Sequence, residues 1–314
     1  MSTSTTTVDV LLGTYNGARF LPEQLTSLEN QTFRNWRLIA RDDGSSDATR
    51  AVLADFKARH PNSVILVEGE SGRLGSTGNF GRLLAESTAD FGLFCDQDDV
   101  WQPNKIEQLL ALAEEHSLRD APLLVHSDLE VVDRDLHLVA PSLWRYQFIR
   151  PANCRTSRLL VQNVVTGCAC LFNAALRRAA LPIPPEAIQH DWWLALVASA
   201  AGKIRWTNVP LVRYRQHGDN DTGAKAWNPT YLRNHARQFF QRGAFQKKIL
   251  AYQRQAEALI GHPSFGLFSF GSQATVRDFA TMGTRRYPGR VGVVLRHRIL
   301  KTGVLRNLAL LARI

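Results

Sequence analysis

Short apolar runs alternate with amphipathic segments along the first part of the chain. Four of these runs have the length of single buried strands: residues 8–13, 36–40, 64–67 and 91–95. Leu21, Leu25 and Leu28, and later Leu53 and Phe56, have the spacing of amphipathic helices between them. Strands that alternate with helices predict right-handed crossovers and a mostly parallel sheet. We therefore expect an α/β fold in which helices flank the sheet.

The same pattern continues less regularly up to about residue 225. Strands are expected at residues 123–132, 161–173 and 204–212, and a helix is expected from His190 onward. Small residues around Gly167 would allow another group to approach the second of these strands. We expect one unit over residues 1–225, divided near residue 120, and a separate C-terminal region over residues 226–314.

The C-terminal region is predicted to be helical and is strongly basic. Residues 226–314 contain fifteen lysines and arginines and two acids, whereas residues 1–225 sum to a small negative charge. Such asymmetry indicates an anionic partner. The mixture of apolar and basic residues over 291–314 favours a helix lying on an anionic membrane surface. The alternative partner is a nucleic acid, whose bases could stack on Tyr231, Phe239, Phe240 and Tyr252, but no nucleic-acid-binding motif is present and we expect none to bind.

The composition is that of an ordinary globular protein, which excludes a fibrous or disordered chain. The first residues show no secretory leader, and no apolar run approaches the length of a membrane span. The four cysteines lack a complete zinc-binding spacing and are expected to be reduced thiols. These features predict a cytoplasmic protein.

An acidic cluster follows the fourth expected strand. Asp96, Asp98 and Asp99 come directly after the apolar residues 93–95. Ligands of open α/β sheets bind outside the carboxyl ends of the strands, and two carboxylates one residue apart can share a divalent cation such as Mg²⁺. The alternative is that Asp99 or Gln102 only caps the helix that Pro103 opens.

Other expected loops reach the same crevice. Residues 14–16 follow the first strand and Asp43 follows the second, while Asp47 is better interpreted as the N-cap of the next helix. The glycine-rich residues 72–80 form an expected loop that could bring backbone N–H groups close to a phosphate. Together these segments could bind the base, ribose and diphosphate of a nucleotide.

Two residues of the second part are candidates for chemistry. Asp191 is the best placed general base for attack by a hydroxyl group, although an N-cap role at the start of its helix is an equal alternative. His217 lies in a polar segment with no apolar face to occupy. Three tryptophans could stack on sugar rings or fill the core: Trp101, Trp192 and Trp193.

Six motifs occur in order along the chain: TYNG, RDDGSSD, DQDDVW, NVVTGCACLFN, HDWWLALVASAAGKI and YRQHG. As a set, over about residues 8–220, they resemble the glycosyltransferase family 2 enzymes of the GT-A fold. The forms DQDDVW, HDWW and YRQHG are most similar to the bacterial rhamnosyltransferase branch. The resemblance implies an inverting, metal-dependent transfer of a sugar to a saccharide or lipid-linked saccharide acceptor in cell-surface polysaccharide synthesis. The donor would be dTDP-rhamnose, or alternatively a UDP-hexose.

The resemblance also implies roles for individual residues. The donor-binding residues would be Thr14, Tyr15, Asn16, Asp43, Asn79 and Asp96. Asp98, with His217 and Asp96, would hold Mg²⁺ or Mn²⁺, and Asp191 would be the catalytic base. His190 stands before this base where many relatives have Glu, and Gly167 would leave room for the acceptor. Residues 1–120 would then bind the donor and residues 121–225 the acceptor, while the charge of residues 226–314, which the resemblance does not cover, predicts docking on the inner face of the cytoplasmic membrane.

Overall fold

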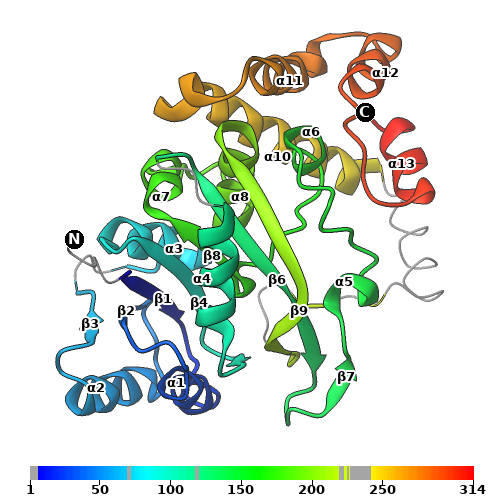
Figure 1. Ribbon diagram of the computed structural model, residues 1–314. Coiled ribbons are helices and arrows are strands. Elements are labelled where there is room, and N and C mark those ends of the chain that lie inside the picture. Colours follow the sequence, from blue (N-terminus) through cyan, green and yellow to red (C-terminus); the bar gives the residue numbers. More distant parts are fainter. Residues whose placement is uncertain (1–5, 69–71, 117–119, 219–222, 225, 227–241) are drawn as a thin grey trace.

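The computed structural model describes residues 6–68, 72–116, 120–218, 223–224, 226 and 242–314 (Figure 1). Among these residues nine strands form one mixed sheet, in the order β3-β2-β1-β4-β8-β6-β9-β5 with β7 beside β6. The strands are β1 Val8–Thr14, β2 Trp36–Asp42, β3 Val64–Leu66, β4 Phe91–Asp96, β5 Val100–Trp101, β6 Leu123–Val132, β7 Leu138–Ala140, β8 Cys170–Asn173 and β9 Lys203–Arg215.

The N-terminal half of the sheet is parallel. β1 pairs with β2 on one side and with β4 on the other, and β3 extends the sheet beyond β2. Residues 10–12 of β1 are fully buried because helices cover both faces of the sheet, which is why parallel strands appear as continuous apolar runs in a sequence. The predicted α/β fold with a mostly parallel sheet is therefore confirmed.

Three helices connect these strands: α1 Leu21–Glu29, α2 Thr49–Arg59 and α3 Gly75–Glu86. The expectation of a glycine-rich loop over residues 72–80 was wrong for most of its length. Only the first residues are loop, and α3 begins at Gly75, whose backbone has a positive φ of 71° that glycine adopts without strain.

The second half of the sheet mixes directions. β8 is antiparallel to β4 and β6, while β9 runs parallel to β6 and antiparallel to β5. Its helices are α4 Lys105–His116, α5 Leu143–Tyr146, α6 Thr156–Leu159, α7 Ala174–Ala180 and α8 His190–Ala201.

The strand expected over residues 161–173 is largely absent. Residues 161–166 are irregular, η1 Gly167–Ala169 is a 3₁₀ turn, and only β8 is a strand. The side chain of Asn163 accepts a hydrogen bond from the N–H of Val165, and such an Asx turn bends the chain out of a strand.

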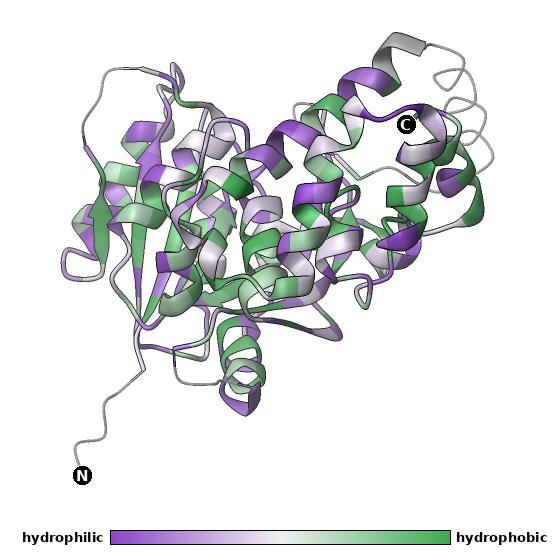
Figure 2. Cartoon of the chain, turned by 90° about the horizontal axis from the view of Figure 1, so that it is seen from above, coloured by the Kyte–Doolittle hydropathy of each residue, from purple (hydrophilic) through white to green (hydrophobic). Residues whose placement is uncertain are grey.

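The C-terminal helices run from α10, beside α8, through α11 and α12 at the top of the view to α13 at its right (Figure 1), and Figure 2 shows hydrophobic and hydrophilic residues on the same helices near the C terminus. They are α10 Arg242–Gly261, η2 Pro263–Leu267, α11 Phe270–Thr281, η3 Met282–Thr284, α12 Tyr287–Arg296 and α13 Val304–Leu311. Residues 227–241 of the expected helical region lie outside the described residues. No helix that the structure describes combines the length and apolar character needed to cross a bilayer.

A single helix over residues 291–314 was expected, and the structure corrects this. α12 and α13 are separated by a turn in which Arg298 and Gly303 have positive φ values of 54° and 96°. The apolar side chains of this segment fall into a buried set and an exposed set. Val293, Val294, Ile299, Leu310 and Ile314 are buried in the same hydrophobic cluster as α8, and a second set remains exposed.

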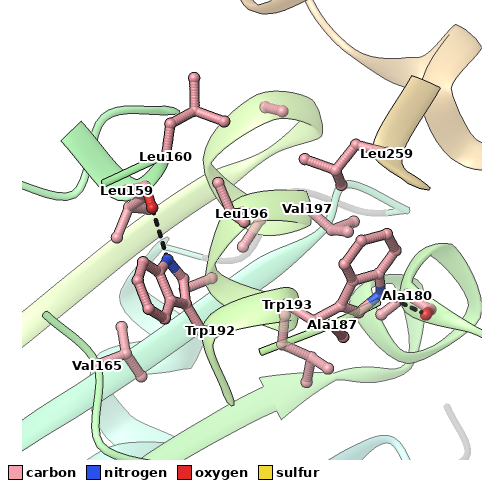
Figure 3. Close-up of a cluster of buried hydrophobic side chains, with 14 of the residues drawn as sticks. Leu159, Leu160, Val165, Ala180, Ala187, Trp192, Trp193, Leu196, Val197 and Leu259 are labelled. Carbon is pink, nitrogen blue, oxygen red and sulfur yellow. Dashed lines mark hydrogen bonds between the residues drawn. The ribbon is translucent and has the colours of Figure 1, made fainter. Parts of the chain in front are cut away.

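The core on this side of the sheet contains two tryptophans of α8 (Figure 3). Trp192 donates its indole N–H to the carbonyl of Leu159 at 2.5 Å, and Trp193 donates to the carbonyl of Ala180 at 2.9 Å. Both rings are buried among aliphatic side chains with their polar atoms satisfied, which is the usual condition for a core tryptophan.

Candidate active site

A pocket of about 1000 Å³ opens at the carboxyl ends of β1, β2 and β4. All nine candidate residues line it: Thr14, Tyr15, Asn16, Asp43, Asn79, Asp96, Asp98, Asp191 and His217. The three tryptophans do not line it, so the core interpretation holds for them. Trp101 is buried beneath the ammonium group of Lys105, which lies 3.1 Å from the centre of its ring.

The loop after β1 is held to the end of β4 by Gln97. The side-chain amide of Gln97 accepts from the N–H of Tyr15 at 2.8 Å and donates to its carbonyl at 2.9 Å. A Cβ at Gly17 would lie 2.1 Å from the same amide, so any larger residue there would displace the Gln97 side chain from Tyr15. The guanidinium of Arg73 lies over the Tyr15 ring at 3.7 Å. Tyr15 is therefore fixed on the pocket wall.

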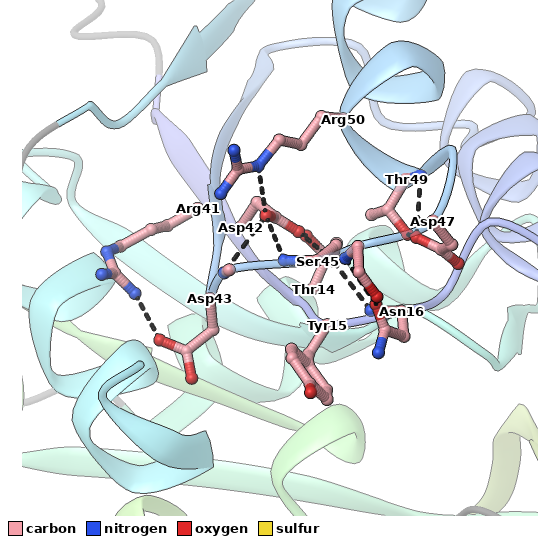
Figure 4. Close-up of polar contacts among 12 residues, drawn as sticks. Thr14, Tyr15, Asn16, Arg41, Asp42, Asp43, Ser45, Asp47, Thr49 and Arg50 are labelled. Carbon is pink, nitrogen blue, oxygen red and sulfur yellow. Dashed lines mark hydrogen bonds and ion pairs between the residues drawn. The ribbon is translucent and has the colours of Figure 1, made fainter. Parts of the chain in front are cut away.

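The neighbouring loops are joined by hydroxyl and carboxylate groups (Figure 4). Thr14 donates to Asp42 at 3.1 Å, and Arg50 forms an ion pair with the same carboxylate. Asn16 donates its N–H to Ser45. Asp47 lies one residue before the N-cap position of α2 and accepts from the N–H of Thr49 at 3.0 Å, so its expected role at the helix start is approximately right.

Asp43 has a structural task that sequence reasoning missed. Its carboxylate accepts from the N–H groups of Leu74 and Gly75, at 2.7 and 2.8 Å, where α3 begins. Arg41 bridges Asp43 and Asn79 with two contacts of 2.8 Å. A carboxylate is stabilised at a helix N-terminus, so Asp43 both lines the pocket and ties β2 to α3.

Asp98 and His217 meet although 119 residues separate them. Asp98 Oδ2 lies 2.7 Å from His217 Nε2. The antiparallel pairing of β5 with β9, in which Val100 is opposite Arg213, brings the segment before β5 alongside the segment after β9. The ring of His217 packs on Phe20 with centroids 4.7 Å apart. A carboxylate and an imidazole thus converge on one part of the pocket wall.

Arg215 supports this arrangement and was not singled out from the sequence. Its side chain is 2% exposed and donates from Nε to the carbonyl of Asp98 at 2.7 Å, while its own N–H donates to Asp99 at 3.1 Å. It also forms an ion pair with Glu23. Asp99 accepts this bond, and no hydrogen bond among the described residues joins its carboxylate to α4, so it does not cap that helix, as one alternative held. The available signal was a basic residue two positions before His217, three residues after the expected strand over 204–212.

The donor set on the pocket wall fits a divalent cation. Asp98 and His217 offer a carboxylate oxygen and an imidazole nitrogen, and Asp96 adds a second carboxylate. Burial and the neighbouring charges of Asp98 and Asp191 raise the pKa of Asp96 to about 7. A nearby positive charge would be favourable at such a group.

A second cluster of potential ligands lies deeper. The ligand atoms of Asp96, Asp99 and Cys168 lie within 4.8 Å of one another. However, Asp99 and Cys168 do not line the pocket, and the ammonium of Lys105 donates to the carbonyl of Cys168. A cation in this place would lie beside that ammonium, so the pocket wall is the better metal site.

Asp191 lies in the first turn of α8, one residue after the helix begins, so the N-cap interpretation was wrong. Its carboxylate accepts from the N–H of Gly167 at 2.9 Å and from the side chain of Asn163 at 3.2 Å. Burial raises the pKa of Asp191 to about 7. A carboxyl that titrates near neutrality can take up a proton from a bound hydroxyl and release it again.

The absence of a side chain at Gly167 allows the first turn of α8 to lie close to the backbone. A Cβ at this position would lie 3.0 Å from His190 Nε2 and 3.4 Å from Asp191 Cβ, so the close approach of α8 is one reason for glycine here, and Gly167 also lines the pocket. His190 stacks on Phe80 with ring centroids 4.0 Å apart, and burial lowers its pKa to about 3. Within the described part of the chain neither of its ring nitrogens has a hydrogen-bond partner, although the residue lines the pocket.

The aromatic residues considered for nucleic-acid stacking receive no support. Tyr252 packs on Trp192 with ring centroids 5.5 Å apart, and its hydroxyl accepts from Lys301. Tyr231, Phe239 and Phe240 lie outside the described residues.

Comparison with known proteins agrees with the geometry. The family model described as glycosyl transferase family 2 matches residues 9–182. The putative glycosyltransferase EpsE of Bacillus subtilis is 32% identical over 110 residues, which are 35% of this chain and 39% of EpsE. The glucosyltransferase WfgD of Escherichia coli, named for UDP-Glc and an α-D-GlcNAc-diphosphoundecaprenol acceptor, is 26% identical over 161 residues, which are 51% of this chain and 57% of WfgD.

An uncharacterized glycosyltransferase of a Nostoc species is 26% identical over 225 residues, which are 68% of this chain and 66% of the relative. The chain therefore matches between about two fifths and two thirds of the length of these relatives.

Solved structures share the fold at low identity. TarS of Staphylococcus aureus (residues 1–349, in complex with UDP) superimposes with a TM-score of 0.57 at 14% identity, covering 90% of this chain and 72% of that chain. The mannosyltransferase PcManGT of Pyrobaculum calidifontis, in complex with GDP-Man and Mn²⁺, gives 0.50 at 17% identity and covers 95% and 86%. The sheet and its flanking helices are of the GT-A type. Because the family model matches more than half of its residues, the chain belongs to glycosyl transferase family 2.

Proposed function

We propose that this protein transfers a sugar, with inversion, from a nucleotide-sugar donor to a hydroxyl of a saccharide acceptor in cell-surface polysaccharide synthesis. The observation that carries the proposal is that Asp191 shares one pocket with Asp96, Asp98 and His217. The pocket volume of about 1000 Å³ is at the upper end of the roughly 300–1,000 Å³ common for ligand sites. A nucleotide sugar and part of an acceptor can therefore bind together.

The donor would bind across the ends of β1, β2 and β4. Thr14, Tyr15, Asn16 and Asp43 line the part of the pocket assigned to the base and ribose. Asn79 and the first turn of α3 line the adjoining wall, where backbone N–H groups of a helix N-terminus favour a diphosphate. We assign residues 1–120 to the donor, residues 121–225 to the acceptor, and residues 226–314 to a separate function considered below.

Asp191 would act as the general base. Its carboxylate accepts the proton of the acceptor hydroxyl while the oxygen forms a bond to the anomeric carbon. The bond from this carbon to the donor diphosphate breaks, and its electron pair leaves with the nucleoside diphosphate. Attack opposite the leaving group inverts the anomeric configuration, and Asp191 then releases the proton to water.

Asp98 and His217, with Asp96, would hold the divalent cation. When bound, Mg²⁺ or Mn²⁺ stabilises the negative charge that develops on the departing diphosphate. Asp98 and His217 are already in contact on the pocket wall, so they need little rearrangement to share a ligand.

For the donor we propose dTDP-rhamnose, because the DQDDVW, HDWW and YRQHG forms resemble the rhamnosyltransferase branch. A UDP-hexose is the second candidate, since WfgD is named for UDP-Glc and a TarS structure contains UDP-GlcNAc. WfgD is also named for a diphosphoundecaprenol acceptor, which supports a lipid-linked saccharide here. The enzyme would then work at the inner face of the cytoplasmic membrane.

A thermal-shift panel tests the proposal without knowledge of the acceptor. The panel contains dTDP-rhamnose, UDP-glucose, UDP-galactose, UDP-N-acetylglucosamine and GDP-mannose, each with Mn²⁺, Mg²⁺ or EDTA. A ligand that binds only the native state raises the Tm. We expect an EDTA-sensitive rise with dTDP-rhamnose. A rise with a UDP-hexose alone would change the donor, and no rise with any compound would contradict the proposed function.

A further inference from the structure

α13 exposes a group of aliphatic side chains. Val304, Leu305 and Leu308 are 75%, 59% and 58% exposed and lie on adjacent turns of this helix. Tyr287 at the start of α12 is also exposed, and its hydroxyl donates to the carbonyl of Leu311 at the end of α13. α12 and α13 therefore contribute to one surface, which we call the α12–α13 face.

The charge around this face is mostly basic, although Asp278 of α11 forms ion-pair contacts with Arg285 and His297. Residues 282–314 contain eight lysines and arginines and no aspartate or glutamate. The exposed arginines are Arg285 and Arg286 before α12, Arg296 in its last turn, and Arg298 between the two helices. A surface that presents aliphatic side chains among basic ones matches a bilayer of anionic lipids, whose phosphates attract the cations while its acyl region accepts the aliphatic groups.

The α12–α13 face is connected to the acceptor side of the pocket. Arg306 of α13 donates to the carbonyls of Gln147 and Phe148, each at 3.0 Å. The N–H of Thr302 donates to Gln162 at 2.6 Å. Gln147 lines the pocket, and Gln162 directly precedes the lining residues 163–167. α13 and the turn before it are thus bonded to segments that line, or directly precede residues lining, the acceptor side of the pocket.

We propose that the α12–α13 face docks the protein on the surface of an anionic phospholipid bilayer. This proposal deepens the proposed function, because docking here would bring the acceptor side of the pocket close to a lipid-linked saccharide. A nucleic acid would also be attracted by the cations, but its phosphate backbone would not bury the aliphatic side chains of Val304, Leu305 and Leu308. A second copy of the chain would have to place the exposed arginines of this face against the same arginines.

Vesicle sedimentation with the full chain tests the docking without any donor or acceptor. We expect binding to vesicles of phosphatidylcholine and phosphatidylglycerol, little binding to phosphatidylcholine alone, and weaker binding at high salt. Replacing two aliphatic residues, Leu305→Ser with Leu308→Ser, should reduce the partition coefficient at least about tenfold. Arg286→Gln with Arg296→Gln should reduce it by about fivefold for each cation removed.

The matched control is Leu138→Ser with Val139→Ser. These residues of β7 are 58% and 51% exposed, close to the values for the α13 leucines, but lie outside the α12–α13 face. We expect this control to bind vesicles as the unaltered protein does. All variants should keep their Tm and their donor-induced thermal shift, so loss of docking can be distinguished from loss of folding or of donor binding.

Several results would overturn the docking proposal. They are absence of binding to anionic vesicles, equal loss in the β7 control, or binding that does not depend on anionic lipid. A change of oligomeric state in the Leu305/Leu308 variant without any change in vesicle binding would assign the face to a second copy. Loss of oligonucleotide binding in the arginine variant, with vesicle binding intact, would assign it to a nucleic acid.

Discussion

The guanidinium of Arg215 donates a hydrogen bond of 2.7 Å to the main-chain carbonyl of Asp98. Arg215 also contacts Glu23 and donates to the carbonyl of Arg134 at 2.6 Å, so its side chain joins three separate segments. His217 follows two residues later and meets the Asp98 carboxylate. Arg215 is therefore a positioning residue for both candidate metal ligands.

Arg215→Lys should weaken metal binding more than it weakens the fold. Lysine keeps a positive charge near Glu23 but lacks the planar set of donors that reaches three acceptors. Loss of a group that orients metal ligands typically costs about 10–100-fold in affinity. Calorimetric titration with Mn²⁺ in the presence of nucleoside diphosphate measures this. Glu23→Gln is the control, because it leaves the bond to Asp98 intact; equal Mn²⁺ affinity in all three proteins would contradict the positioning role.

Asp98→Asn should remove the metal-dependent part of donor binding. An amide is a weaker ligand than a carboxylate, and a divalent cation prefers charged oxygen donors. The donor-induced rise in Tm should then be the same with Mn²⁺ and with EDTA. Cys168→Ser is the matched test of the deeper cluster and should leave the metal dependence unchanged. If Cys168→Ser lost the metal dependence and Asp98→Asn kept it, the cation would be assigned to the cluster of Asp96, Asp99 and Cys168.

The rate of transfer should rise with pH around neutrality. Asp191 is a base only when ionised, and its pKa is raised from 3.8 to about 7, so the rate should be low at about pH 6 and approach a plateau above about pH 8. Initial rates across this range measure the effect. A rate that is flat over the whole range would contradict the role of Asp191.

The same pKa makes ionised Asp191 unfavourable for stability. The pKa of Asp191 is about 7 in the folded protein and 3.8 in the unfolded chain, so the folded state holds the proton more tightly. The stability from this protonated carboxyl is fully present below pH 3.8 and is lost as the pH rises through about 7. Asp191→Asn cannot ionise, so its Tm relative to the unaltered protein should be higher at about pH 8 than at about pH 5. Paired melts at the two pH values check the sign, and a constant difference would show that the carboxyl is not coupled to folding.

His190→Phe should stabilise the protein and impair transfer. Phenylalanine preserves the stacking on Phe80 and removes two buried nitrogens that have no hydrogen-bond partner among the described residues, each of which costs about 1–3 kcal/mol. The gain in Tm over the unaltered protein should grow below about pH 6.5. In that range His190 is protonated in the unfolded chain but stays neutral in the folded protein, where its pKa is about 3, and this favours unfolding of the unaltered protein. If a sugar hydroxyl bonds to this ring, the KM for donor or acceptor should rise. Unchanged kinetics would leave His190 with a packing role alone.

Much of the site could be predicted because ligands gather where parallel strands end. Asp96 and Asp98 follow an apolar run whose burial on both faces is evident from composition, and the order of the strands places Asp43 at the same edge. Asp191 and His217 were candidates from their local sequence, but only the motif resemblance linked them to Asp98, since nothing in their local sequence reveals that a pocket joins them to it.

The missed features depend on contacts between distant residues. Asp43 receives the N–H groups of a helix that begins 32 residues later, and the role of Arg215 depends on a carbonyl 117 residues earlier. The apolar run over 161–173 resembles a strand, but Asn163 bends the chain, and the following turn holds Asp191 through Gly167. Helical periodicity continues through residues 297–303, where two residues of positive φ turn the chain.

The most direct test follows the hydrolysis of the donor identified by the thermal-shift panel, with water as acceptor, by ¹H NMR. Anomeric protons distinguish the configuration of the first free sugar before it equilibrates, and the acceptor need not be known. We expect a metal-dependent release of sugar with inverted configuration, reduced about 10²–10⁴-fold in Asp191→Asn although this variant still binds the donor. Release with retained configuration, or an equal rate in Asp191→Asn, would contradict an inverting transfer with Asp191 as its base.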